Sequence, residues 1–218
     1  MSEKPILFSG EMVRAILEGR KTQTRRVSKD QGEGVFFEYV ENNPTYPEYW
    51  NGKGSMPYTG WVVKYPNLGI YLPRLCPYGK VGDRLWVRET WNAMNGHGQW
   101  WHDVKASKAA RQLYNWAWTN PVQPALQEIP PRWLPSIHMP RAASRITLEI
   151  VNVRVERIQQ INQNENDAIA EGVSSTKYSS EALCARDAFM GLWDSINAKR
   201  GYGWDVNPWV WVIEFKVV

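Results

Sequence analysis

The sequence predicts an α+β fold in which one bent sheet curls into a small barrel. Strand-like stretches are separated by two or three helical stretches, without the regular strand–helix–strand repetition of a parallel α/β sheet. The longest strand-like stretch, residues 144–157, also changes its apolar face midway, as strongly curved sheets require. The 218 residues contain no internal repeat and no linker, so we expect residues 1–218 to form a single domain.

The first helix is expected directly after a short strand at residues 5–8. Ser9 is a good N-cap residue, and apolar residues follow it at helical spacing, namely Met12, Val13, Ile16 and Leu17. Gly19 suits the position just past the helix end, where the left-handed conformation is common. Residues 21–27 alternate β-branched and polar side chains, so a strand is expected to follow this helix closely.

Two stretches rich in Gly, Pro, Asn and aromatic residues are expected to be insertions around the mouth of the barrel. The first, residues 28–75, contains a candidate hairpin with strands at 35–40 and 61–65. The second, residues 92–135, contains a helical patch near 107–118. Many of the thirteen tryptophans fall in or beside these stretches, where we expect them to pack long loops against the core.

The strands of the second half carry the clearest patterns. A Gly-Asp turn leads into a strand at residues 84–89. In the 144–157 strand the apolar positions shift from even to odd numbers, which predicts a β-bulge near Ile150 and Val151. The final strand, residues 209–218, is apolar on both faces in its first half, so we expect it to be a central strand.

Two helices are expected between these last strands. Asn162 to Glu165 forms a capping-box-like start, and the helix that follows should stop at Gly172. A longer helix is expected over residues 181–199, because its apolar side chains recur at helical spacing and Gly201 follows its end.

Composition excludes several classes of protein. The formal net charge of +4 permits contact with a few phosphates but does not resemble that of a protein that wraps a long duplex. The three histidines, His97, His102 and His138, are too scattered for a metal site, so we expect no metal and no other cofactor. No stretch resembles a signal peptide or approaches the ~20 apolar residues of a membrane span, so we expect a cytoplasmic protein without membrane contact.

Lys21, Thr24 and Glu171 are the candidate catalytic residues. Residues 19–26, Gly-Arg-Lys-Thr-Gln-Thr-Arg-Arg, place four cations and two hydroxyl groups behind a helix end, and Lys21 and Thr24 can meet only if Lys21 lies in the turn. Glu171 lies at a helix end, where the helix dipole disfavours ionisation and biases a carboxyl pKa upward. The alternative is a solvated basic turn and an exposed glutamate.

Several stretches resemble the ASCH-domain family, which belongs to the PUA-like superfamily. These are GRKTQTRR at 19–26, GKVGDRLWVRE at 79–89, DAIAEG at 167–172 and WVIEFKVV at 211–218. The Gly-x-Lys-x-x-Thr-x-Arg pattern, met by Gly19, Lys21, Thr24 and Arg26, is its most specific mark. The chain also looks like larger ASCH proteins carried by phages and prophages. The resemblance implies a PUA-like curved β-barrel with flanking helices and a cleft beside it.

The resemblance also implies a choice of functions. Family members are credited with RNA binding and some with nuclease activity, and one bacterial member is an amidohydrolase that deacylates N4-acetylcytidine. Its Lys, Thr and Glu correspond to Lys21, Thr24 and Glu171. Thr24 would be the nucleophile, Lys21 the base and Glu171 the acid, and the three arginines around Lys21 would help to lower its pKa. A water nucleophile, with Thr24 positioning the substrate, is the alternative. The alternatives are a non-catalytic module that binds RNA or DNA, as in phage regulation, and a nuclease.

Further basic and aromatic residues are candidates for binding a nucleoside or a single-stranded nucleic acid. Arg84, Trp86 and Arg88 share one face of a strand, where two guanidinium groups flanking an indole could hold a base and a phosphate. A core tryptophan with solvated neighbours is the alternative. Arg26 belongs to the motif, and Arg145 could contact phosphate or cap the start of a strand. The oligomeric state does not follow from the sequence.

Overall fold

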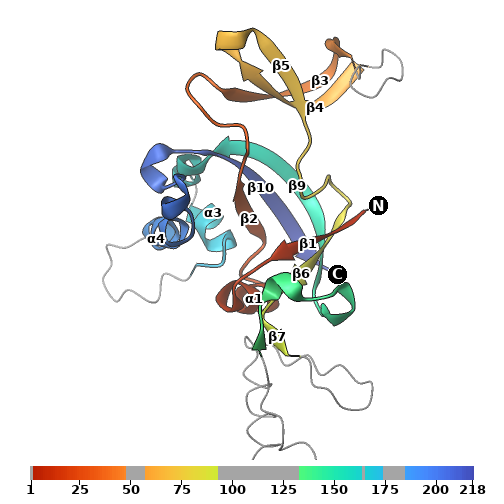
Figure 1. The fold of residues 1–218 in the computed structure, drawn as a ribbon, viewed down its shortest axis with the longest axis vertical. Coiled ribbons are helices and arrows are strands. Elements are labelled where there is room, and N and C mark those ends of the chain that lie inside the picture. The colour runs from red at the N-terminus through yellow and green to blue at the C-terminus, as the bar shows by residue number, and fades with distance from the viewer. Residues whose placement is uncertain (1, 48–56, 93–132, 164, 174–184) are drawn as a thin grey trace, which may run out of the picture.

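The computed structural model describes residues 2–47, 57–92, 133–163, 165–173 and 185–218. Three helices are α1 (Gly10–Leu17), α3 (Glu165–Ala170) and α4 (Ala185–Asn197). The strands are β1 (Glu3–Leu7), β2 (Gln23–Val27), β3 (Phe36–Pro47), β4 (Pro57–Tyr65), β5 (Ile70–Arg74), β6 (Arg84–Arg88), β7 (Trp91–Asn92), β8 (Trp133–Leu134), β9 (Thr147–Arg157) and β10 (Trp209–Val217). The expected α+β class is confirmed (Figure 1). The helical patch predicted near 107–118 lies outside the described residues.

The main sheet has five strands in the order β1-β6-β9-β10-β2. Strand β1 runs parallel to β6, and the other neighbours are antiparallel. As expected, β10 is an inner strand between β9 and β2.

The expected closed barrel is wrong, because the sheet remains open between its edge strands β1 and β2. At one edge, β1 ends after five residues and the chain turns into α1. At the other, the end of α3 approaches the start of β2: Thr22 N, just before β2, donates to the carbonyl of Ala170, the last residue of α3, at 2.9 Å. A side chain crosses between the two edges instead, since Arg26 Nη2 on β2 donates to the Leu7 carbonyl on β1 at 2.7 Å.

The predicted β-bulge is confirmed in β9. Glu214 of β10 lies opposite Asn152 and Phe215 lies opposite Ile150, so Val151 is the extra residue. Ile150 is fully buried whereas Val151 is 42% exposed, and the buried positions resume at Val155. The bulge therefore produces the change of face that the sequence pattern indicated. The longest described strand is nevertheless β3, with 12 residues against 11 for β9.

A second sheet of three strands, in the order β3-β4-β5, covers part of the first. The predicted hairpin is present as β3 and β4, and β5 was not expected from the sequence. Phe37 packs edge-on against Trp209 and Trp211 of β10, with ring centroids 5.4 and 6.0 Å apart. Part of the 28–75 stretch is therefore an ordered sheet that contributes to the core.

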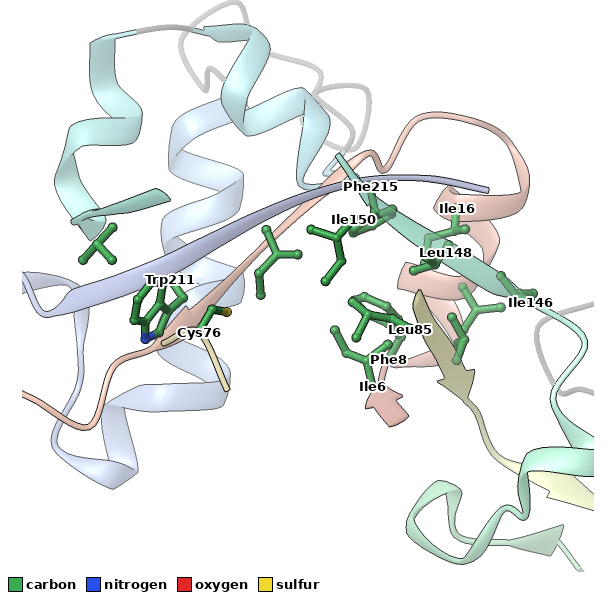
Figure 2. Close-up of a cluster of buried hydrophobic side chains, with 14 of the residues drawn as sticks. Ile6, Phe8, Ile16, Cys76, Leu85, Ile146, Leu148, Ile150, Trp211 and Phe215 are labelled. Atoms are coloured by element: carbon green, nitrogen blue, oxygen red, sulfur yellow. The ribbon is translucent and has the colours of Figure 1, made fainter. Parts of the chain in front are cut away.

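Two apolar clusters lie on opposite faces of β10. The first contains Trp211, Ile213 and Phe215 with side chains of β1, α1, β6 and β9 (Figure 2). The second contains Val210 and Val212 with Phe189 and Trp193 of α4 and other residues near α3. The apolar character of both faces of the last strand follows from this position between two cores.

Candidate functional site

Lys21 and Glu171 form a buried ion pair at the edge of the main sheet. Lys21 lies between α1 and β2, and its backbone forms an antiparallel bridge with Glu171 just after α3. Lys21 Nζ donates to Glu171 Oε2 at 3.0 Å and to the Glu171 carbonyl at 2.8 Å. The exposed fractions of the two side chains are 0% and 4%. The structure thus places Lys21 in the turn after α1, in direct contact with Glu171.

Gly172 allows this close approach. Its φ of +83° lies in the left-handed region, which favours glycine. A Cβ atom at this position would lie 2.9 Å from the Cβ atoms of both Ala15 in α1 and Lys21. The glycine therefore lets the end of α3 pack directly on α1 and on the stem of Lys21.

The second oxygen of Glu171 binds a second cation. Arg25 Nη1 donates to Glu171 Oε1 at 3.0 Å, and Arg25 Nη2 contacts Glu156 at 2.5 Å and Asp167 at 3.2 Å. Arg154 continues the network through its own contacts with Glu156, Asp167 and Glu214. A buried carboxylate is tolerated only when it is paired and hydrogen-bonded, and Glu171 meets both conditions.

Burial sets the protonation behaviour of Lys21. Desolvation lowers the pKa of the Lys21 ammonium, and Arg26 and Arg25 also lower it, whereas Glu171 acts in the opposite direction without cancelling the shift. Two of the three arginines expected to depress this pKa therefore do so. The third, Arg20, is exposed and binds Glu18 at 2.5 Å.

Thr24 and Arg26 lie on the other face of β2. Thr24 is opposite Ile213, and both belong on the side of the first core, whereas Arg25 is opposite Val212 on the side of the second. Within the described part of the chain, no hydrogen bond joins Thr24 to Lys21 or Glu171, so the expected three-residue contact is seen only for the pair. Thr24 itself is buried, with 3% of its surface exposed.

Phe8 connects the two sides of this edge. Lys21 Nζ lies 5.6 Å from the centroid of the Phe8 ring, and the Arg26 guanidinium lies 5.3 Å from it. Arg26 also approaches the Tyr78 ring at 6.0 Å, and its Nε is buried without a hydrogen-bond partner. Thr24 is two residues from Arg26 on the same face of β2. Its side chain therefore points to the same side as that of Arg26, where the Phe8 ring lies near Lys21 Nζ.

The remaining binding candidates do not join this group. Arg84, Trp86 and Arg88 lie on the face of β6 opposite Leu85 and Val87, which belong to the first core. Trp86 is 8% exposed, and the Arg88 guanidinium lies 4.6 Å from its ring centroid. In this arrangement the indole supports the arginine.

Arg145 is held by a buried acid just after β6. It binds Glu89, whose side chain is 1% exposed, at 3.0 Å. The residues that the sequence did not point to are Glu156, Asp167 and, as a partner of Glu171, Arg25. One signal was available, because Asp167 and Glu171 are four residues apart at a helix end, a spacing that places two side chains on one face.

Other expectations concern metals and membranes. No group of three or more His, Cys, Asp or Glu residues suited to a metal ion occurs among the described residues. His138 is exposed, whereas His97 and His102 lie outside the described ranges. Over the same part of the chain, no helix is long and apolar enough to cross a membrane.

Comparisons with known proteins give one structural likeness. No protein-family model matches the chain, and no curated protein matches it. Among solved structures, the chain is similar to one described as a high-resolution crystal structure of an ASCH domain from Lactobacillus crispatus JV V101. The sequence identity is 16% and the TM-score is 0.38, and the match covers 99% of this chain and 79% of that chain.

Proposed function

We propose that this protein is an ASCH-type amidohydrolase that holds a nucleoside beside Lys21 and Glu171 and removes the acyl group from N4-acylated cytosine. The observation that carries the proposal is the buried ion pair itself, with Nζ and Oε2 3.0 Å apart. A fully buried lysine with a lowered pKa is suited to act as a base, because its neutral form is more accessible than that of a solvated lysine.

The pair can supply a base and an acid together. Transfer of one proton from the Lys21 ammonium to the Glu171 carboxylate produces a neutral amine and a protonated acid without changing the net charge. The neutral amine accepts the hydroxyl proton of Thr24 as its oxygen attacks the acyl carbonyl carbon. Glu171 then protonates the departing exocyclic nitrogen of cytosine, and water hydrolyses the acyl-threonine ester. All three side chains are buried, which would keep these proton transfers away from bulk water.

The test is a panel of N4-acylated cytidines followed by ultraviolet absorbance. Lys21→Met, Thr24→Val and Glu171→Gln keep approximate side-chain volume, and each is expected to lower turnover by ~100- to 10,000-fold. Thr22→Val is the matched control, because Thr22 is an exposed threonine beside the motif. Circular dichroism of each variant separates loss of chemistry from loss of fold. Wild-type turnover in folded Lys21→Met would overturn the mechanism.

Binding without turnover is the second candidate function. Both carboxylate oxygens of Glu171 already accept hydrogen bonds from cations, which is also the arrangement of a structural ion pair. Saturable binding of cytidine or of a single-stranded RNA, with no hydrolysis of any acylated nucleoside, would favour this candidate.

A further inference from the structure

Two arginines on the outer face of β6 form no ion pair among the described residues. Arg84 lies directly opposite Glu3 on β1 and Glu149 on β9. Each of those acids binds another cation, since Glu3 contacts Arg141 at 2.9 Å and Glu149 contacts Lys216 at 3.1 Å. Within the described ranges, neither Arg84 nor the second arginine, Arg88, forms an ion pair or a side-chain hydrogen bond.

The Nε atoms of both arginines are buried and unpartnered. Arg84 Nε and Arg88 Nε are two of the few buried side-chain nitrogens in the described part of the chain that have no hydrogen-bond partner. Such donors are rare in folded proteins, because an unsatisfied buried donor costs ~1–3 kcal/mol. Arg88 is moreover held against the Trp86 ring at 4.6 Å, which restricts its side chain before any ligand arrives. Both arginines are half-buried, so part of each remains open to solvent.

The charge and spacing of this face fit a chain of phosphates. Among the described residues, four cations of this face, Arg84, Arg88, Arg141 and Lys216, lie near two carboxylates, those of Glu3 and Glu149. Arg84 and Arg88 are four residues apart in an extended strand, hence ~13 Å apart along it. Guanidinium groups bind phosphate oxygens through paired N–H donors. We propose that Arg84 and Arg88 form a strip that binds the phosphodiester backbone of a single-stranded nucleic acid.

A single strand fits better than a duplex. The net charge of the whole chain is only +4, and affinity for duplex DNA grows with the number of phosphates neutralised. A short strip on a strand face also contacts a few neighbouring phosphates of one flexible strand without having to match the width of a groove.

The strip ends next to β1, the strand that Arg26 reaches from β2. Arg88 lies opposite Leu7, whose carbonyl accepts a hydrogen bond from Arg26 at 2.7 Å. Arg26 and Lys21 both approach Phe8. If the proposed function holds, on which this step rests, the substrate is an acylated cytidine within a strand, with its neighbouring phosphates on Arg84 and Arg88.

Binding of the strip can be measured without catalysis. We expect the double variant Arg84→Gln, Arg88→Gln to bind a short fluorescent single-stranded RNA at least ~10-fold more weakly in anisotropy titrations. The slope of log K against log salt should fall by roughly 1.4, that is about 0.7 for each phosphate that the variant no longer neutralises. The control double variant Arg14→Gln, Lys80→Gln removes two exposed cations elsewhere and should keep the slope of the wild type. The double variant Arg84→Lys, Arg88→Lys keeps both charges and should recover part of the affinity. This recovery would show that the weaker binding of the glutamine variant is not caused by misfolding.

Several results would overturn the proposal that Arg84 and Arg88 bind a single-stranded nucleic acid. One is equal affinity of the strip variant and the control variant. Another is competition by inorganic phosphate as effective, per phosphate, as that by the oligonucleotide, which would indicate a free-anion site. Equal binding of polyglutamate would show that the strip accepts any polyanion.

The same titrations separate this inference from the proposed function. Strip-dependent binding by a wild-type protein that deacylates nothing would refute the enzyme and leave the strip in place. Loss of deacylation of an acylated oligonucleotide, but not of free acylcytidine, in the strip variant would support both.

Discussion

At the scale of single residues, the stability of the protein should depend on both partners of the buried Lys21–Glu171 pair. Removing one partner of a buried ion pair commonly costs ~3–5 kcal/mol, because the other charge is left unpaired. Lys21 has no exposed side-chain surface, so truncation to alanine would leave a cavity as well as an unpaired carboxylate. Methionine at position 21 fills the volume, so the loss of stability that remains reflects the carboxylate left without its lysine partner.

Asp83 is a residue whose charge should contribute to stability as the pH falls into the acid range. Its carboxylate accepts hydrogen bonds from the backbone nitrogens of Ser2 at 2.7 Å and Lys80 at 3.2 Å, and these lower its pKa to about 2. The unfolded pKa is ~3.9, so the stabilisation is present above pH ~4 and is lost as the pH falls toward 2.

Urea unfolding of the wild type and of Asp83→Asn should therefore converge in acid. We expect the variant to be less stable at pH 7, and the difference in free energy of unfolding to shrink as the pH falls through the interval between those two pKa values. A difference that stays constant over this interval would show that the Asp83 charge is not the cause.

The sequence predicted individual site residues better than their partners. Lys21 and Glu171 each stood out locally, one in a basic turn after a glycine and the other at a helix end. Arg25 did not stand out, because its function depends on Glu156 and Glu171, which are 131 and 146 residues away. Strand alternation allows Trp86 either a core or a ligand-binding position, and its burial depends on packing that alternation does not specify.

At the scale of elements, Gly172 allows the end of α3 to pack closely on α1. Gly19 and Gly172 both have a left-handed φ, +71° and +83°. A Cβ at Gly19 would meet nothing within 4 Å, whereas a Cβ at Gly172 would meet Ala15 and Lys21 at 2.9 Å. A substitution at either glycine therefore costs free energy because the backbone is left-handed. A substitution at Gly172 also causes a steric clash, whereas one at Gly19 does not.

Gly172→Ala should be the more damaging of the two variants. Gly19→Ala should cost on the order of 1 kcal/mol for the left-handed conformation alone. Gly172→Ala should cost that amount plus the separation of α3 from α1, and it should also impair any activity of the Lys21–Glu171 pair. Thermal or urea unfolding measures both, and equal losses at the two positions would contradict the close contact.

Elements with strong local patterns were predicted correctly. The bulge at Val151 followed from a change of apolar parity within one strand, and the inner position of β10 followed from its two apolar faces. Strand β5 was missed, because Ile-Tyr-Leu-Pro-Arg has little alternation and its proline argues against a strand. Its hydrogen-bonded pairing with β4 stabilises a strand conformation that its own sequence does not favour.

At the scale of the whole molecule, the main sheet has two edges that a side chain joins. Arg26 extends from β2 to the Leu7 carbonyl of β1 and packs over Phe8. Closure of a barrel depends on strand number and stagger, which the sequence pattern does not encode, and the prediction of a closed barrel failed there.

Arg26→Gln should weaken the contact between the β1 and β2 edges of the sheet. The shorter amide cannot reach the Leu7 carbonyl, so we expect faster hydrogen exchange of β1 amides. Amides of α4, in the second core, should exchange as in the wild type. Mass spectrometry of labelled peptides measures both regions. Arg14→Gln, in exposed α1 surface, is the charge-matched control. Unchanged exchange in β1 would mean that Arg26 does not hold the edges together.

The pairing of β2 with β10 also fixes when the site can form as the protein is made. Val27 pairs with Val210, so β2 leaves the ribosome long before its backbone partner exists. At ~5–20 residues per second the interval is roughly 10–40 s. For most of that time, residues 21–27 have neither their strand partner nor Glu171, and a nascent chain with this basic segment unpaired is a candidate client for chaperones. The segment gains its backbone partner only after translation has passed the final strand.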